Sequence, residues 1–333
     1  MKRALVTGGA GFIGSNLAVE LERLGWKVSV LDDFSSGHFE NLKGFSGEVI
    51  GGDICSPQDW AQRVGPVDAV FHQAAITDTT VTDQLRMMRV NVEGFRNVLE
   101  FALSYDTKTI VYATSAGVYG PGPCPMRESQ APAPLNIYAF SKMVMERTAS
   151  DFAAAHDGIG VVGLRDFNVY GARENHKGAA ASMIWQLHGQ MRAGRRPRVF
   201  KHGEQYRDFI YVKDVVAANL RALAWGKRGV FNVCTGKGTD FNAVIGHLNR
   251  AAGTALEPEY FDNPYSFYQN QTLGNPQEAE RVLGFKAAYT AEDGIADYLG
   301  KRPQSAPSGR GERPPSGDGG PLAAAADGAR GRA

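Results

Sequence analysis

The sequence has few cysteines, no long apolar run and no excess of either charge. Cys55, Cys124 and Cys234 are odd in number and far apart, without a CxxC spacing or a nearby histidine pair, so we expect buried thiols in a reducing compartment. No stretch reaches the roughly 20 apolar residues of a membrane span, and no leader is expected. The 36 basic and 35 acidic residues give a net charge of +1. We therefore expect a cytoplasmic protein without nucleic-acid or membrane partners and without a metal.

Short apolar runs alternate with amphipathic stretches through the first half of the chain. The apolar runs are RALVTG, KVSVLDD, VDAVFHQAA and KTIVYATS, and helical spacing lies between them, as in IGSNLAVELERLG. This alternation is typical of β-α-β units and predicts an α/β fold with a Rossmann-type, doubly wound parallel sheet. Two later strands, in GVVGLRDFNVYG and GVFNVCTG, and further amphipathic helices predict a smaller, mixed α/β substrate-binding domain.

These patterns indicate two domains and a tail. We expect residues 1–170 to form the dinucleotide-binding domain, with 204–235 returning to it, and 171–203 with 236–300 to form the substrate-binding domain. From 301 to 333 the chain is rich in Gly, Pro, Ala and Arg and nearly free of large apolar residues. Such a segment buries too little to offset its ordering entropy, so we predict that 301–333 are disordered.

A glycine-rich turn follows the first predicted strand. In VTGGAGFIG, Gly8 permits a tight turn, Gly11 lets the backbone approach a pyrophosphate, and Gly14 lets the following helix pack on the strand. The free N–H groups and partial positive charge at the start of that helix attract phosphate. Because the motif stands between a strand and a helix, it predicts dinucleotide binding, and we expect Phe12 and Ile13 in the same turn to take part.

Acidic residues end the next two predicted strands. Asp32, about 20 residues beyond the glycines, is placed to accept hydrogen bonds from the adenosine ribose hydroxyls. Asp32 and Asp33 would repel the 2'-phosphate of NADP, and no Arg or Lys occurs before Lys43, so we predict NAD, with NADP as the alternative. For Asp33 itself we favour a role in stabilising the turn. Asp53 ends the third strand, where it reaches the adenine edge or caps the following turn.

A serine, a tyrosine and a lysine supply the expected acid/base chemistry. Tyr138 and Lys142 in NIYAFSK are four residues apart, which places both on one face of a helix. A free tyrosine has a pKa of about 10, and a nearby ammonium group lowers that pKa because it favours the phenolate. Tyr138 would then accept a proton from a sugar hydroxyl as hydride leaves the carbon. Ser115, just past a strand end, would hold the same oxygen.

The motifs TGGAGFIG, SAGVYG, YAFSK and FNVYG resemble those of the extended short-chain dehydrogenase/reductase superfamily over nearly all of residues 1–300. Within it, FNVYGARENHKGAAASM and RDFIYVKDV are similar to the ADP-L-glycero-D-manno-heptose 6-epimerases, which invert C6'' of a nucleotide-linked heptose made for lipopolysaccharide cores. The resemblance implies an NAD(P)-dependent nucleotide-sugar epimerase, an isomerase that acts on a nucleotide-diphosphate sugar as a homo-oligomer. The further cofactor-binding residues that we expect are Ile54, Ala74, Ala75 and Asn91, together with Tyr138 and Lys142.

The resemblance also assigns residues to the substrate. The family's lysine in the HKG segment faces the substrate opposite the tyrosine and falls on Lys177. Return of hydride to the other face of a keto intermediate needs an acid/base where Tyr138 no longer reaches, and Lys177 can serve if burial or positive charge lowers its pKa. The alternative for Lys177 is a contact with the substrate diphosphate. For His176 we favour an orienting role over a share in either task.

Two further residues are expected at the substrate. The superfamily's RDF arginine falls on Arg207, whose planar guanidinium suits a diphosphate, with a salt bridge to Asp208 or Asp214 as the alternative. Asn168 in FNVYG resembles the family's asparagine beside the transferred sugar, with a structural turn as the alternative.

Two positions depart from the pattern of the superfamily. Asp166 stands where an aromatic residue is usual, and it would either oppose the ionisation of Tyr138 or pair with Arg165; we favour the pair. Ser35 stands where the family has a basic residue for the 2'-phosphate, which again favours NAD over NADP.

Three functions are open at this point. One is C6'' epimerisation of a nucleotide-activated heptose, which the HKG segment favours. Another is the reaction of a UDP-hexose 4-epimerase or a related NDP-sugar enzyme. The third is a binding module that senses the cofactor without turnover, against which the intact Ser115, Tyr138 and Lys142 argue. Dehydration and decarboxylation are disfavoured, because Ala116 and Gly117 occupy the places of the acidic residues in sugar dehydratases and decarboxylases.

Overall fold

The computed structural model describes residues 1–79, 81–264 and 270–301. Within this part of the chain, seven parallel strands form one sheet in the order β11-β6-β5-β4-β1-β2-β3. The strand order reverses between β1 and β4, which is the place where ligands bind in such sheets. This topology confirms the predicted Rossmann-type, doubly wound fold. The strands are β1 (Arg3–Thr7), β2 (Lys27–Asp32), β3 (Glu48–Gly51), β4 (Ala69–His72), β5 (Thr109–Ser115), β6 (Gly160–Asp166) and β11 (Arg228–Val233).

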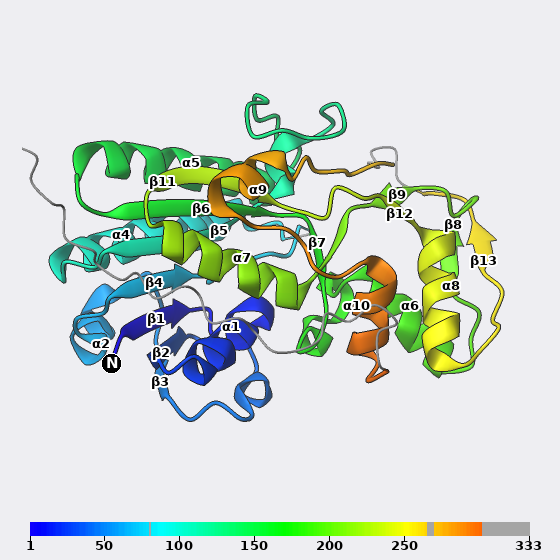
Figure 1. Cartoon of the computed structure of the whole chain (residues 1–333), viewed down its shortest axis with the longest axis horizontal. Coiled ribbons are helices and arrows are strands. Elements are labelled where there is room, and N and C mark those ends of the chain that lie inside the picture. Colours follow the sequence, from blue (N-terminus) through cyan, green and yellow to red (C-terminus); the bar gives the residue numbers. More distant parts are fainter. Residues whose placement is uncertain (80, 265–269, 302–333) are drawn as a thin grey trace, which may run out of the picture.

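Helices cover both faces of the sheet (Figure 1). Apolar residues at three- and four-residue spacing, such as Leu17 and Leu21 of α1, give each helix one face that packs on the strands. On one side α1, α7 and α9 close the core, and on the other side α2, α4 and α5 do so. These helices are α1 (Phe12–Arg23), α2 (Ala61–Val64), α4 (Gly94–Ser104), α5 (Ile137–Ala155), α7 (Val212–Trp225) and α9 (Gln277–Leu283).

A smaller region lies at the other end of the molecule, at the right of Figure 1. Its core is formed by α6 (Met183–Arg192), α8 (Phe241–Ala252) and α10 (Ala291–Tyr298). Among the described residues, short strands form three two-stranded sheets, which are β7 (Asn168–Tyr170) with β10 (Phe209–Tyr211), β9 (Tyr206–Arg207) with β12 (Thr239–Asp240), and β8 (Arg198–Phe200) with β13 (Glu259–Phe261). The short helices are α3 (Gln84–Met88), η1 (Phe39–Leu42), η2 (Pro57–Asp59), η3 (Arg89–Glu93), η4 (Ala116–Tyr119) and η5 (Asn175–Ala180).

The predicted strand GVVGLRDFNVYG is two strands in the structure. β6 ends at Asp166 in the main sheet, whereas β7 begins at Asn168 and pairs with β10. Phe167 is the residue at which the chain crosses from the large sheet to the small one. β11, within the predicted returning segment 204–235, is an edge strand of the main sheet. The domain boundaries at the residues given above stay a prediction.

Three other expectations meet different outcomes. Cys234 is buried as predicted, but Cys55 and Cys124 are partly exposed, and all three are free thiols. The predicted tail beyond Lys301 lies outside the described residues. In the part of the chain that the structure describes, no helix has the length and apolar character needed to cross a bilayer.

Candidate active site

A cavity of about 670 Å³ lies at the carboxyl edge of the main sheet. Because the strands are parallel, their carboxyl ends meet at this edge and bring together residues that are distant in sequence. Most of the predicted site residues line this cavity. They are Gly8, Gly11, Phe12, Ile13, Gly14, Asp32, Asp53, Ile54, Ala74, Ala75, Ser115, Tyr138, Lys142, His176 and Lys177.

The glycine turn between β1 and α1 has no room for side chains. Gly8 has a positive φ of +67°, and a Cβ there would lie 2.6 Å from the main-chain nitrogen of Ala74. A Cβ on Gly14 would collide with the carbonyl oxygen of Gly8. The turn therefore brings β4 close to β1 and seats the start of α1 against the cavity, where its N–H groups are available to an anion. This arrangement fits the pyrophosphate of a dinucleotide.

Asp32 is held in place by the main chain at the end of β2. It is 7% exposed, and its two carboxylate oxygens accept hydrogen bonds from the N–H groups of Ala10 (2.8 Å) and Phe34 (2.9 Å). Burial raises the pKa of Asp32, while these two hydrogen bonds lower it. Asp33 accepts hydrogen bonds from the N–H (2.9 Å) and hydroxyl (2.7 Å) of Ser35, which is the predicted turn contact.

Asp53 lines the cavity at the end of β3 and also supports its own turn. Its Oδ1 accepts a hydrogen bond from the N–H of Cys55 at 2.8 Å. The sequence left a contact with the adenine and a contact within the turn as alternatives, and the structure shows the turn contact. The role at the adenine stays a prediction.

Replacing Asp32 with Ala is expected to shift the cofactor preference toward NADP, because it removes a negative charge that opposes the 2'-phosphate and an acceptor for the ribose hydroxyls. The ratio of the two dissociation constants should change by about tenfold or more, since one charge–charge contact is worth a pKa unit or more. Fluorescence titration of both cofactors measures it. Asp33→Ala is the matched control and should shift the ratio less. If the wild-type protein binds NADP as tightly as NAD, the assignment of this strand end is incorrect.

Ser115, Tyr138 and Lys142 converge on the cavity from β5 and α5. Asn136 caps α5 by accepting a hydrogen bond from Ala139 N–H (2.8 Å), which places Tyr138 in the first turn and Lys142 one turn later. Lys142 is 2% exposed; its Nζ donates to the carbonyl oxygen of Ala113 (2.8 Å) and lies 5.9 Å from the centre of the Tyr138 ring. The predicted acid/base group is therefore assembled in space.

The ionisation of Tyr138 differs from the expectation. Burial of its hydroxyl raises the pKa of Tyr138 to about 12; a hydrogen bond with Ser115 lowers it and the charge of Asp166 raises it. The predicted lowering is thus wrong for the protein without its ligands, because loss of water destabilises the phenolate more than nearby groups stabilise it. Burial lowers the pKa of Lys142 to about 8, while Asp166 and Glu146 raise it.

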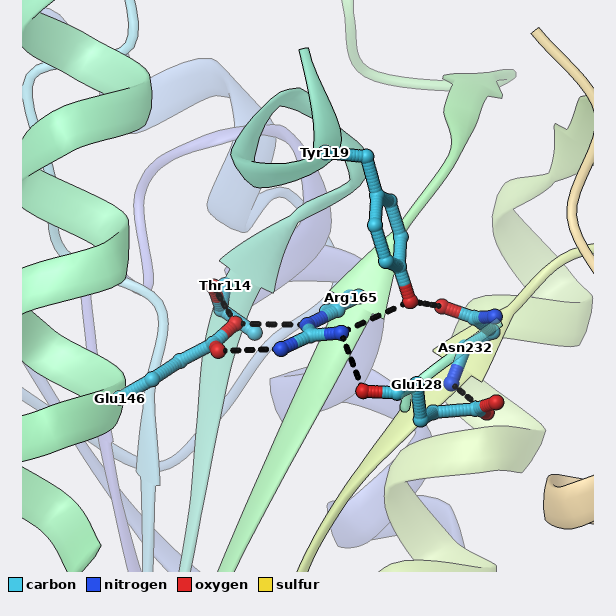
Figure 2. Close-up of polar contacts among 6 residues, drawn as sticks. All are labelled: Thr114, Tyr119, Glu128, Glu146, Arg165 and Asn232. Carbon is cyan, nitrogen blue, oxygen red and sulfur yellow. Dashed lines mark hydrogen bonds and ion pairs between the residues drawn. The ribbon is translucent and has the colours of Figure 1, made fainter. Parts of the chain in front are cut away.

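The preferred pairing of Asp166 with Arg165 is also wrong. Consecutive residues of a strand point to opposite faces of the sheet, so β6 directs these two side chains apart. Figure 2 shows Arg165 between Glu146 and Tyr119. Arg165 is 5% exposed, and its guanidinium binds both carboxylate oxygens of Glu146, at 2.6 and 2.9 Å, and the Tyr119 hydroxyl at 2.8 Å. Such two-pronged, charge-assisted contacts are strong and directional.

The same network joins the elements that carry the acid/base residues (Figure 2). Thr114, next to Ser115 on β5, donates a hydrogen bond to Glu146 on α5 at 2.7 Å. Tyr119 of η4 donates to the side chain of Asn232 on β11 at 2.6 Å. These contacts fix β5, α5 and β11 relative to β6, and so they fix the position of Ser115 relative to Tyr138.

Lys177 and His176 reach the cavity from η5. Lys177 is partly buried, with its Nζ 5.7 Å from the centre of the Phe12 ring; burial lowers its pKa and Glu174 raises it. His176 Nδ1 lies 3.0 Å from both Asn41 Nδ2 and the carbonyl oxygen of Arg173. The contacts of His176 are those of a side chain that holds its loop. The catalytic role of Lys177 stays a prediction.

Asn91 lies behind the cavity wall rather than in it. The side chain is fully buried, accepts a hydrogen bond from Ile76 N–H (2.8 Å) and donates one to the Ile76 carbonyl (3.0 Å). Ile76 belongs to the segment after β4 that lines the cavity together with Ala74 and Ala75. The Asn91 side chain therefore holds in place the segment that would contact the cofactor, and it lies behind that segment.

Asn168 and Arg207 lie outside the cavity wall. Asn168 Oδ1 accepts a hydrogen bond from the Thr272 hydroxyl at 3.0 Å. Arg207 Nη1 donates to the carbonyl oxygens of Tyr206 (2.9 Å) and Asn270 (3.1 Å). Both residues follow the crossing from β6 into the smaller region, and their roles at the substrate stay predictions.

Residues that the sequence did not single out also line the cavity. Arg86 adds a cation from α3, Asp78 comes from the segment after β4, and Phe167 comes from the crossing after β6. The one local signal for α3 is Asp83, which accepts a hydrogen bond from Arg86 N–H (2.9 Å) as the helix cap. A helix of five residues is too short to show an apolar period, so periodicity does not reveal it.

Known proteins resemble this chain in sequence and structure. The model of the NAD dependent epimerase/dehydratase family matches residues 4–234. The ADP-L-glycero-D-manno-heptose-6-epimerase of Helicobacter pylori is 39% identical, with a TM-score of 0.84 over 90% of this chain and 95% of that one. The UDP-glucose 4-epimerase of Thermotoga maritima, solved with UDP-glucose, is 30% identical, with a TM-score of 0.83 over 90% and 97%. The UDP-N-acetylglucosamine 4-epimerase of Methanobrevibacter ruminantium M1 is 28% identical, with a TM-score of 0.83 over 90% and 97%.

A Rossmann sheet with a glycine turn and a Ser-Tyr-Lys group at its carboxyl edge defines an extended short-chain dehydrogenase/reductase. The chain belongs to the NAD dependent epimerase/dehydratase family. It is thus an NAD-dependent enzyme, as the sequence predicted.

Proposed function

We propose that this protein epimerises a nucleotide-activated sugar, with C6'' of ADP-glycero-manno-heptose as the preferred centre, by transient oxidation. The observation that carries the proposal is the convergence of two separate acid/base candidates on one cavity. Tyr138, supported by Ser115 and Lys142, comes from α5 and β5, and Lys177 comes from η5. For inversion at C6'' we assign one acid/base group to each face of the ketone, whereas a simple dehydrogenase needs such help on one face.

The residues suggest a division of labour. Ser115 holds the reacting hydroxyl, and Tyr138 accepts its proton while the hydrogen on the same carbon departs as hydride. NAD, which the glycine turn and Asp32 would hold, would supply the acceptor and later the donor of that hydride. After the ketone turns its other face, Lys177 gives a proton to the oxygen as hydride returns. One turnover leaves the cofactor and the total number of protons unchanged, but it moves one proton from Lys177 to Tyr138, so that proton must return to Lys177, by exchange with water, before the next turnover in the same direction.

A UDP-hexose 4-epimerase is the second candidate. The two 4-epimerase structures superpose on this chain almost as well as the heptose epimerase, with TM-scores of 0.83 against 0.84. That reaction would use Tyr138 as its acid/base and would leave Lys177 as a diphosphate ligand. The HKG segment and the identity of 39%, against 30% and 28%, favour the heptose. With the heptose as substrate, we also propose that the protein acts in the synthesis of lipopolysaccharide cores, that it is located in the cytoplasm, and that it forms a homo-oligomer.

Purified protein with NAD is expected to interconvert the C6'' epimers of ADP-glycero-manno-heptose in a panel of ADP-, GDP-, CDP- and UDP-sugars. NMR of each sugar follows the configuration, and a deuterated cofactor reports the hydride path. Tyr138→Phe protein is the matched blank. Inversion at C4 of a UDP-hexose alone would select the second candidate. Unchanged configuration of every sugar would contradict both.

A further inference from the structure

Asp166 lies beside Ser115 at the carboxyl edge of the sheet. The two residues are register partners of the parallel strands β5 and β6, so their side chains point to the same face. Asp166 lines the cavity that also holds Tyr138 and Lys142. Its Oδ1 is buried and finds no hydrogen-bond partner among the residues that the structure describes. An unpaired carboxylate oxygen in such a place is costly unless a nearby charge compensates it.

The compensating charge is that of Lys142. Burial raises the pKa of Asp166 to about 7, and Lys142 lowers it; burial lowers the pKa of Lys142 to about 8, and Asp166 raises it. Tyr138 also faces Asp166, whose charge opposes the phenolate. Asp166 is thus coupled to both ionisable members of the acid/base group.

The other charged groups around Lys142 are already engaged or neutral. Glu146, on the next turn of α5, is bound by Arg165 and Thr114. His72 on β4 stays neutral, because burial and the charge of Lys142 lower its pKa to about 3. Two carboxylates of the described residues act on Lys142, those of Asp166 and Glu146, and Asp166 is the one that no arginine binds.

We propose that Asp166 is a positioning residue for the acid/base group: its buried carboxylate acts by its charge, without a direct ion pair, on the Lys142 ammonium and on the ionisation of Tyr138. The inference rests on the proposed function only in taking Tyr138 as the reacting group. Removing the negative charge of Asp166 makes a proton easier to remove from each neighbour, so both the phenol and the ammonium titrate at lower pH. A residue that merely fills space would move neither titration.

The test titrates Tyr138 in the NAD-bound protein. Tyrosine is labelled with ¹³C at Cζ, and the resonance missing from Tyr138→Phe protein belongs to Tyr138. Asp166→Asn is expected to lower the pKa of Tyr138 by roughly one pH unit, whereas Asp166→Glu should stay closer to the wild type. Asp151→Asn removes an exposed carboxylate from the same helix and should leave the titration unchanged.

A second readout works at milder pH. The affinity for NAD, measured by calorimetry between about pH 6 and 9, should contain a proton-linked step near the pKa of Asp166. Asp166→Asn should lose that step, and the step that remains, from Lys142, should move to lower pH. Asp166→Ser is the variant to measure if Asp166→Asn does not fold. An unchanged or raised pKa of Tyr138, or a binding profile with the same steps at the same pH as in the wild type, overturns the inference. A lowered pKa in a protein that inverts no nucleotide sugar would instead count against the proposed function and leave the role of Asp166 standing.

Discussion

Tyr138→Phe is expected to lower epimerase turnover by about 10²–10⁴-fold, which is the usual loss when a general acid/base is removed. Phenylalanine keeps the ring in place and removes only the hydroxyl that is hydrogen-bonded to Ser115. The reacting sugar hydroxyl then has no proton acceptor on that face. Binding of NAD should be nearly unchanged, because the glycine turn and Asp32 are untouched. NMR of the sugar measures turnover, and fluorescence titration measures NAD affinity.

Lys142→Met should behave differently from Tyr138→Phe. We expect Lys142 to contact the nicotinamide ribose as well as to tune the phenol, so its loss should reduce both turnover and NAD affinity. The matched control for Tyr138→Phe is Tyr260→Phe, which removes an exposed tyrosine hydroxyl outside the cavity wall. That hydroxyl donates a hydrogen bond to Asn242 at 2.9 Å. Near-normal turnover of Tyr138→Phe would exclude Tyr138 as the acid/base. Equal NAD affinity of the Tyr138 and Lys142 variants would remove the second role of Lys142.

Lys177→Met is expected to stop interconversion of the two epimers, again with a loss of about 10²–10⁴-fold in turnover. The physical reason is that Lys177 reaches the cavity from η5, while Tyr138 reaches it from α5, so each can serve one face of the ketone. A half-reaction should survive. With NADH supplied as the hydride donor, a substrate analogue with a 6''-carbonyl should still be reduced, with Tyr138 giving the proton, or else dismutated, and the products of one configuration are resolved by NMR.

The competing role of Lys177 gives a different kinetic result. Loss of a diphosphate contact that is equally strong in the ground and transition states raises KM and leaves kcat near normal. Lys227→Met, which removes an exposed lysine outside the cavity wall, controls for the change of charge. A variant at Lys177 with weakened substrate binding and nearly normal kcat would make that residue a phosphate ligand and favour the UDP-hexose 4-epimerase.

The parts of the site that are local in sequence were predictable. The spacing of Gly8, Gly11 and Gly14 belongs to one turn between a strand and a helix, and Tyr138 and Lys142 belong to one helix. In both cases the geometry follows from the few residues between them. The parallel sheet then brings the strand ends together, which is why so many of the predicted residues line one cavity.

Contacts between distant segments were not predictable in the same way. Adjacency suggested that Arg165 pairs with Asp166, but the partner of Arg165 is Glu146 on α5, since a strand directs neighbouring residues to opposite faces. The pKa of Tyr138 depends on how much water reaches its hydroxyl, and this follows from packing that no short motif encodes. The break between β6 and β7 at Phe167 likewise depends on pairing with β10.

The number of residues between the functional side chains of α5 is constrained by the geometry of the helix. Tyr138, Lys142 and Glu146 follow one another at four-residue intervals, and an α-helix turns by about 100° per residue, so the three lie along one stripe. Deleting or inserting one residue among them would turn one end of the stripe by about 100°. Either Tyr138 would leave the cavity or Glu146 would leave Arg165. Insertions and deletions in related chains should therefore fall before residue 136 or after residue 146, and not between Tyr138 and Glu146.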